Sequence, residues 1–164
     1  MGSGKKKTGY IVLLAAAALA VILGSRYERA WRMQQEIAGK VVRFHVIANS
    51  DSARDQKLKL MVRDAIGEEL SAAMAGAETK EECEEIIASH LAKIEETAET
   101  VLRREGCEDE VQAFLDDVNF PVKSYGCVTF PAGRYEALEV VIGEGEGHNW
   151  WCVMYPNMCF AGSV

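Results

Sequence analysis

The twelve residues that decide the fold run from position 41 to position 52 and read VVRFHVIANSDS. In the first seven of them, apolar residues alternate with Arg43 and His45. The alternation predicts a β-strand with one buried side, and Arg43 and His45 are expected on the other side. The Asn-Ser-Asp-Ser run at positions 49–52 is typical of turns and helix caps, so a helix should follow it directly.

Two amphipathic helices are predicted after this turn. Ser52 and Asp55 have the spacing of a capping box, and apolar residues then recur at helical intervals. Thr79 and Glu82 form a second capping box ahead of a longer apolar stripe. His90 lies within that stripe, where we expect a core histidine with a hydrogen-bond partner rather than a ligand.

Three strands are predicted in the second half of the chain, at Val111–Val118, Tyr135–Ile142 and Asn149–Tyr155. Glycines and prolines mark residues 120–133 as a loop-rich stretch. The glycine- and glutamate-rich run 143–147 is expected to be a hairpin-like connection, because its two glutamates would repel a phosphate. This order predicts an α+β fold: a mostly antiparallel sheet with two main helices packed on one face, preceded by an N-terminal signal or anchor helix.

The N-terminus has the layout of an export signal. Lys5-Lys6-Lys7 precedes an apolar run from Tyr10 to Leu23, and no acidic residue occurs before Glu28. The run is shorter than the ~20 residues of a comfortable membrane span, so both a cleaved signal and an uncleaved anchor stay open. We therefore expect a signal peptide or short membrane anchor at 1–24, a tether at 25–40 and a single α+β domain at 41–164.

The composition of the body excludes several classes of partner. Without the three lysines of the leader, 15 basic and 25 acidic residues remain, a net charge of about −10. Such a field would not attract nucleic acid or anionic lipid. Since 49% of the whole chain is hydrophobic, the body should fold into one domain with a substantial core.

The chain has five cysteines, and export would permit disulfides. Cys152 and Cys159 flank Pro156 at a separation of seven residues, which suits a local disulfide. The alternative is that both are small buried hydrophobic residues. An odd number leaves at least one thiol unpaired or bound to another chain.

Few residues suggest catalysis. Cys152 could act as a nucleophile with His148 or His45, but His148 would lie roughly 13 Å away along an extended strand. His45, Asp51, His90 and His148 are scattered and lack the spacing of a metal site. We therefore predict no catalytic residue, no metal and no cofactor.

Two stretches are more specific than these general patterns. The first reads VRFHVIANSDS at 42–52, followed by DQKLKL at 55–60 and VRDA at 62–65. The second reads YG at 125–126, FPAGRYEAL at 130–138, VIGEG at 141–145 and NWWCVMYP at 149–156, with CF at 159–160. Together they resemble the stage II sporulation protein R family over about residues 41–160.

The resemblance implies a function that the residues alone do not. Members of this family are made in the forespore and exported into the space between the two septal membranes. There they signal to a membrane-embedded aspartic protease of the mother cell, which then removes the pro-sequence of the sigma-E precursor. The resemblance implies a trigger of proteolysis and not an enzyme, secreted or anchored to the forespore membrane.

We expect the partner-binding surface to combine the turn after the first strand with the start of the last strand. The two adjacent tryptophans there should point to opposite faces, leaving one of them exposed or covered by a loop. The expected residues are His45, Asn49, Ser50, Asp51, Asn149, Trp150 and Trp151. Two alternatives stay open: an exported cysteine hydrolase acting at the septum, and a membrane-anchored septal scaffold.

Overall fold

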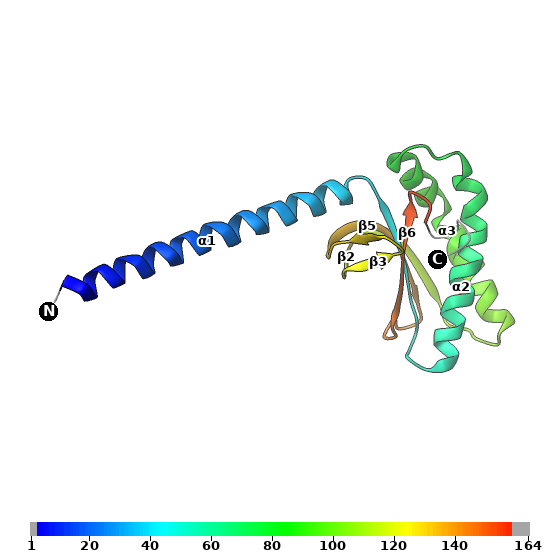
Figure 1. Cartoon of the computed structure of the whole chain (residues 1–164). Helices are drawn as coiled ribbons and strands as arrows, with labels where there is room; N and C mark the ends of the chain where they lie inside the picture. The colour runs from blue at the N-terminus through cyan, green and yellow to red at the C-terminus, as the bar shows by residue number, and fades with distance from the viewer. Residues whose placement is uncertain (1–2, 159–164) are drawn as a thin grey trace. The chain divides into compact units, whose positions relative to one another are not determined.

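The computed structural model describes residues 3–158, and the chain divides into two units, residues 1–36 and residues 37–164 (Figure 1). Helix α1 (Ser3–Ala38) forms nearly all of the first unit. From Gly9 onward this helix is long and apolar enough to cross a membrane, and large apolar side chains along it are exposed. The stretch expected as a tether, 25–40, is helical as far as Ala38.

The second unit is built on a four-stranded sheet in the order β2-β5-β1-β6. The strands are β1 (Val42–Ile47), β2 (Val111–Phe120), β5 (Gly133–Ile142) and β6 (Asn149–Tyr155). Strand β1 pairs parallel with β5 and antiparallel with β6, and β2 pairs antiparallel with β5. The predicted α+β class with a mostly antiparallel sheet is confirmed.

Two helices pack on one face of this sheet (Figure 1). Helix α2 (Ala53–Ala73) begins at Ser52, whose side chain accepts from Asp55 N at 3.1 Å; a short 3₁₀ turn, η1 (Met74–Gly76), follows it. Helix α3 (Lys80–Arg104) begins at Thr79, which accepts from Glu82 N at 3.1 Å. The Ser52 and Thr79 halves of the two predicted capping boxes are present, but Asp55 accepts from Ser50 Oγ and Glu82 accepts from Glu78 N, so neither box is reciprocal. The helices bury an apolar core against the sheet that includes Phe44, Leu70, Ile87, Leu102 and Leu138.

The expectation that β1 has one buried side is wrong, because both of its faces are covered. Arg43 is 0% exposed and His45 is 1% exposed. A second apolar cluster lies on their face of the sheet and includes Phe120, Phe130 and Tyr135. Phe130 belongs to a small hairpin of β3 (Lys123–Tyr125) and β4 (Val128–Phe130), which formed part of the predicted loop-rich stretch.

The connection from β5 to β6 is also not the expected hairpin. Because β5 and β6 lie on either side of β1, residues 143–148 must pass the end of β1 to join them. Strands β5 and β6 each pair with β1, whereas a hairpin would require them to pair with each other. This crossing brings the glycine-rich run against the turn that follows β1.

Candidate functional site: the turn cluster at the end of β1

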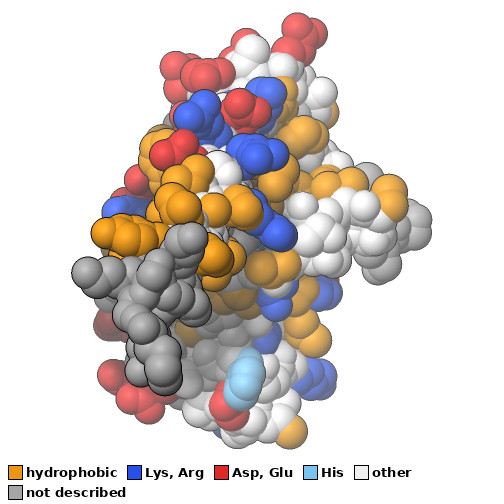
Figure 2. Space-filling model, turned by 60° about the vertical axis from the view of Figure 1, so that its left-hand side comes forward, with side chains coloured by type: hydrophobic (Ala, Val, Ile, Leu, Met, Phe, Trp, Pro, Cys, Tyr) orange, Lys and Arg blue, Asp and Glu red, His pale blue; other side chains and the backbone are white. Residues whose placement is uncertain are grey.

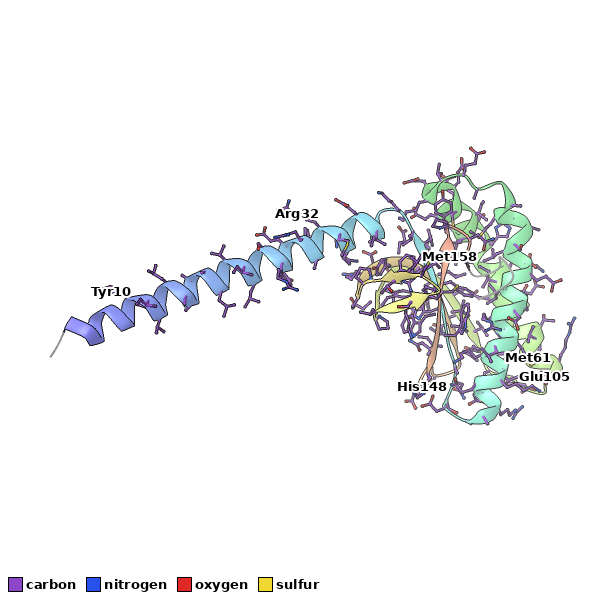
Figure 3. The ribbon with its side chains drawn as sticks, viewed as in Figure 1. Tyr10, Arg32, Met61, Glu105, His148 and Met158 are labelled. Carbon is purple, nitrogen blue, oxygen red and sulfur yellow. The ribbon has the colours of Figure 1, made fainter. Side chains whose placement is uncertain are left out.

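A group of polar residues gathers where β1 ends, which we call the turn cluster and define as Asn49, Ser50, Asp51 and His148. The first three lie in the turn between β1 and α2, and His148 ends the β5–β6 connection at the same edge of the domain (Figure 3). Register pairing of Ile47 with Asn149 places the two segments side by side. The geometry therefore joins the two segments that the sequence predicted for the partner-binding surface.

Backbone hydrogen bonds fasten the β5–β6 connection to the turn. Glu146 N donates to Asn49 O at 3.1 Å, and Gly147 N donates to Ala48 O at 2.9 Å. Glu144 N donates to the Asn49 side-chain oxygen at 2.9 Å. With its backbone groups paired in this way, the loop is held in one conformation although it lies at the surface.

Asp51 and His148 form the exposed centre of the cluster. One carboxylate oxygen of Asp51 accepts from His148 N at 2.6 Å and also contacts His148 Nδ1. These hydrogen bonds hold the pKa of Asp51 below its ordinary value of 3.8. The His148 imidazole is 81% exposed, and Figure 2 shows a histidine at the surface beside an acidic side chain. An oriented imidazole with an accessible Nε2 can bind a polar group of a partner.

Lys59 lies beneath the turn cluster and binds it through hydrogen bonds, a role that was not predicted from the sequence. Its ammonium donates to His148 O at 2.8 Å and to Gln56 Oε1 at 2.6 Å, while the residue is only 5% exposed. Gln56 in turn donates to Ser50 O at 3.0 Å. Burial lowers the pKa of Lys59. A lysine next to Leu58 in the apolar stripe of α2 was the one clue to this role in the sequence.

Glycine is required where the loop meets the turn most closely. A Cβ atom at Gly147 would lie 2.4 Å from Ser50 O, which is a backbone atom. At Gly143, φ is +57° and a Cβ atom would lie 2.4 Å from Asn49 Oδ1. The sequence therefore places glycines where the loop packs on the turn, and not to cradle a phosphate.

Replacing Gly147 by alanine should lower the free energy of unfolding by about 1–3 kcal/mol, because the clash with Ser50 O forces the backbones apart. Chemical denaturation of the full chain in detergent measures this. Gly76→Ala is the matched control, since a Cβ atom there has no neighbour within 4 Å. Equal stabilities of the two variants would contradict the close packing of loop and turn.

The remaining predicted residues lie further inside the domain. Trp150 and Trp151 point to opposite faces of β6, as expected, and both are partly buried. Trp150 contacts Phe44 edge-on, with 5.5 Å between the ring centroids, and Trp151 stacks on His45, with 4.9 Å between the ring centroids. The buried His45 is thus covered by the tryptophan with which it was expected to share a surface.

The catalytic and metal alternatives gain no support from the geometry. Cys152 is 4% exposed, and His148 contacts Asp51 instead of a thiol. His90 is half-buried, and its Nδ1 lies 2.7 Å from Ile86 O within its own helix. Within residues 3–158, no group of three or more potential ligands could hold a metal ion. The predicted Cys152–Cys159 disulfide includes a residue outside that range and stays a prediction.

The fold and the turn cluster define a class: an α+β domain, with an ordered polar turn at its surface, that follows an apolar helix long enough to cross a membrane. Comparison with known proteins gives the family. A family model described as stage II sporulation protein R matches residues 38–164, and the chain belongs to this family. It is similar to stage II sporulation protein R of Bacillus subtilis (strain 168), with 36% identity over 154 residues, 92% of this chain and 68% of that protein. No solved structure gives a significant match.

Proposed function

We propose that this chain is an exported sporulation signal that activates, by binding, a membrane-embedded aspartic protease of the mother cell. That protease would then process the pro-sigma-E precursor. Membership of the stage II sporulation protein R family over residues 38–164 carries the proposal. The apolar helix α1 suits export or anchoring at the forespore membrane, so the domain would act in the intermembrane space.

The proposed mechanism is a shift between two states of the protease. A binding protein changes such an equilibrium only by its differential affinity for the two states. The turn cluster is suited to this task because its loop and turn are ordered before binding, so little entropy is lost when a partner docks. Asp51 and His148 provide one acceptor and one oriented imidazole at its centre.

The proposal predicts that cells lacking this chain do not process pro-sigma-E during sporulation. Immunoblots of pro-sigma-E and sigma-E over the course of sporulation measure this. Restoring the chain should restore processing, whereas the double variant Asp51→Ala/His148→Ala should restore it poorly. Asp64→Ala, which removes another exposed carboxylate on α2, should restore it fully.

The outcomes separate the function from the surface. Normal processing in cells without the chain would remove the proposed function. Full rescue by the Asp51/His148 double variant would keep the function and exclude the turn cluster as the binding surface. Immunoblots of the variants check that each accumulates to the level of the unaltered chain.

A further inference from the structure

Part of the sheet face opposite the helices is left open by the residues that the structure describes. In-register pairing places Phe114, Glu139, His45 and Trp151 in one row across β2, β5, β1 and β6. The next row contains, in the same strand order, Gln112, Val141, Ile47 and Asn149. Residues in such rows project from the same face of the sheet. The helices cover the other face. Among the residues that the structure describes, this face is covered by the β3–β4 hairpin with its neighbours and, at one end, by Gly145, where a Cβ atom would lie 2.7 Å from Val141 and 3.7 Å from Ile47.

The cover extends over Arg43 and His45 but does not reach Phe114 in the middle of β2. Tyr125 and Phe130 of the hairpin contact Arg43, and Phe120 contacts His45. Beyond them Phe114 is 44% exposed, and Val141 and Ile47 are half-buried. We call Phe114, Glu139, Val141 and Ile47 the open patch.

Glu139 lies in the open patch without a cation. Among the described residues, the one basic side chain within 4 Å of its carboxylate is His45, whose Nε2 lies 3.2 Å from Glu139 Oε1 without making a hydrogen bond. Burial and the nearby charge of Arg43 lower the pKa of His45 to about 4, so this imidazole is neutral at neutral pH. Burial, and then the charge of Asp116, raise the pKa of Glu139. The open patch thus places apolar side chains around a half-buried acidic group, and the exposed Asp116 adds a second carboxylate beside it.

This charge pattern selects among the occupants. Anionic lipid and nucleic acid would bring further negative charge. A second copy docked through the same patch in a two-fold dimer would place Glu139 against Glu139, which is unfavourable. A cation with apolar neighbours complements both the carboxylate and the rings around it.

We infer that the open patch is a docking site for a segment of a partner protein that carries a lysine or arginine between apolar side chains. The cation pairs with the Glu139 carboxylate, and the apolar side chains cover Phe114, Val141 and Ile47. This inference deepens the proposed function and rests on it for the identity of the partner, the protease. The chemistry of the occupant rests on the patch alone.

Photo-cross-linking in sporulating cells tests the inference on the full chain. A photoreactive phenylalanine analogue replaces Phe114 in one strain and, as the matched control, Leu60 on α2 in another, since Leu60 is 40% exposed. The analogue at position 114 should cross-link to a peptide of another protein with a lysine or arginine beside apolar residues. The analogue at position 60 should give no such product.

Charge substitution is the second arm. Added to the position-114 analogue, Glu139→Lys should reduce the cross-linked product by about tenfold or more, because two cations would then oppose each other. Glu85→Lys, at an exposed site on α3, should leave it unchanged. If Glu139→Lys does not accumulate in cells, Glu139→Gln decides, since it keeps the shape and removes the charge.

Each outcome supports or overturns the inference. A cross-linked peptide without a cation, a peptide of this same chain, equal yields at positions 114 and 60, or a yield unaffected by Glu139→Gln would overturn it. A basic-apolar peptide from the protease supports both the inference and the proposed function. A basic-apolar peptide from a different protein supports the docking site and removes the protease as its partner.

Discussion

Replacing Arg43 by alanine is expected to lower the free energy of unfolding by about 3–5 kcal/mol, a loss typical of removing a large buried side chain from a network. Arg43 Nε donates to Cys152 O at 2.9 Å, and its NH2 group donates to Tyr125 OH at 3.1 Å. The guanidinium carbon lies 4.3 Å from the ring centre of Phe120 and 5.0 Å from that of Phe130. One side chain therefore joins β1, β6 and the β3–β4 hairpin.

Two further variants divide this effect into packing and charge. Arg43→Met loses both hydrogen bonds and the cation–π contacts but keeps most of the side-chain volume. Because less space is left unfilled, it should lower the free energy of unfolding less than Arg43→Ala does. Arg43→Lys keeps the charge but lacks the planar fork that reaches Cys152 O and Tyr125 together. Chemical denaturation measures the three variants, and hydrogen exchange should show faster exchange in residues 123–130. Unchanged exchange there in Arg43→Ala would contradict the role of Arg43 in holding the hairpin.

The helices and their ends were predictable because their determinants are local. Ser52 and Thr79 accept from the backbone N–H three residues ahead, as their spacing indicates. The C-terminal end of α3 follows local rules too: Gly106 has φ +68°, and Cys107 N donates back to Leu102 O at 2.9 Å. None of these features depends on residues distant in sequence.

The second face of β1 was not predictable from the alternation within β1. The alternation within β1 depends on polarity, and Arg43 and His45 are polar. Their cover comes from Phe120, Phe130 and Trp151, which lie 75 to 106 positions away in the contacts that they make. The three aromatic residues appeared in the sequence only as parts of a loop and a last strand. Burial of polar side chains under aromatic rings requires knowledge of which strands are neighbours.

The turn cluster also combines residues that local patterns predict with a contact that depends on the order of the strands. Asn49, Ser50 and Asp51 were selected for local turn chemistry, but the contact of Asp51 with His148 spans 97 positions. It follows from β5 and β6 lying on opposite sides of β1, an order that the hairpin prediction did not contain. The glycines of the 143–147 run are explained only once that order is known, because they meet Asn49 and Ser50 across the end of β1.

Acidification should destabilise the domain through His45. In the unfolded chain this imidazole takes up a proton at its ordinary pKa of 6.5, whereas burial and Arg43 lower its folded pKa to about 4. Between these values the unfolded state binds more protons, so stability falls as the pH falls. The pKa difference corresponds to a loss of about 3 kcal/mol across that window, with no further loss from His45 below it.

Two charged residues lie near His45, and they affect the dependence of stability on pH in different ways. Arg43 stays charged across the window and only repels the imidazolium. Glu139 has a raised pKa in the folded state, so it binds a proton there more readily than in the unfolded chain. Its effect has the opposite sign and offsets part of the His45 effect. The Glu139→Gln variant should therefore lose stability more steeply between pH 6.5 and about 4 than the unaltered chain.

Denaturation at several pH values across the window tests the slope. His45→Gln cannot take up a proton, so its stability should stay nearly level or rise slightly as Glu139 protonates. The comparison uses slopes, because glutamine also loses the stacking on Trp151 and lowers stability at every pH. His90→Gln is the matched control, because it removes a half-buried histidine from α3 and leaves the buried imidazole of β1 in place, so the two slopes can be compared directly. If stability fell with pH as steeply in His45→Gln as in the unaltered chain, another group would be responsible for the loss. His45 would then take up its proton equally well in the folded and unfolded states, which would contradict its exclusion of charge in the interior beneath the β3–β4 hairpin.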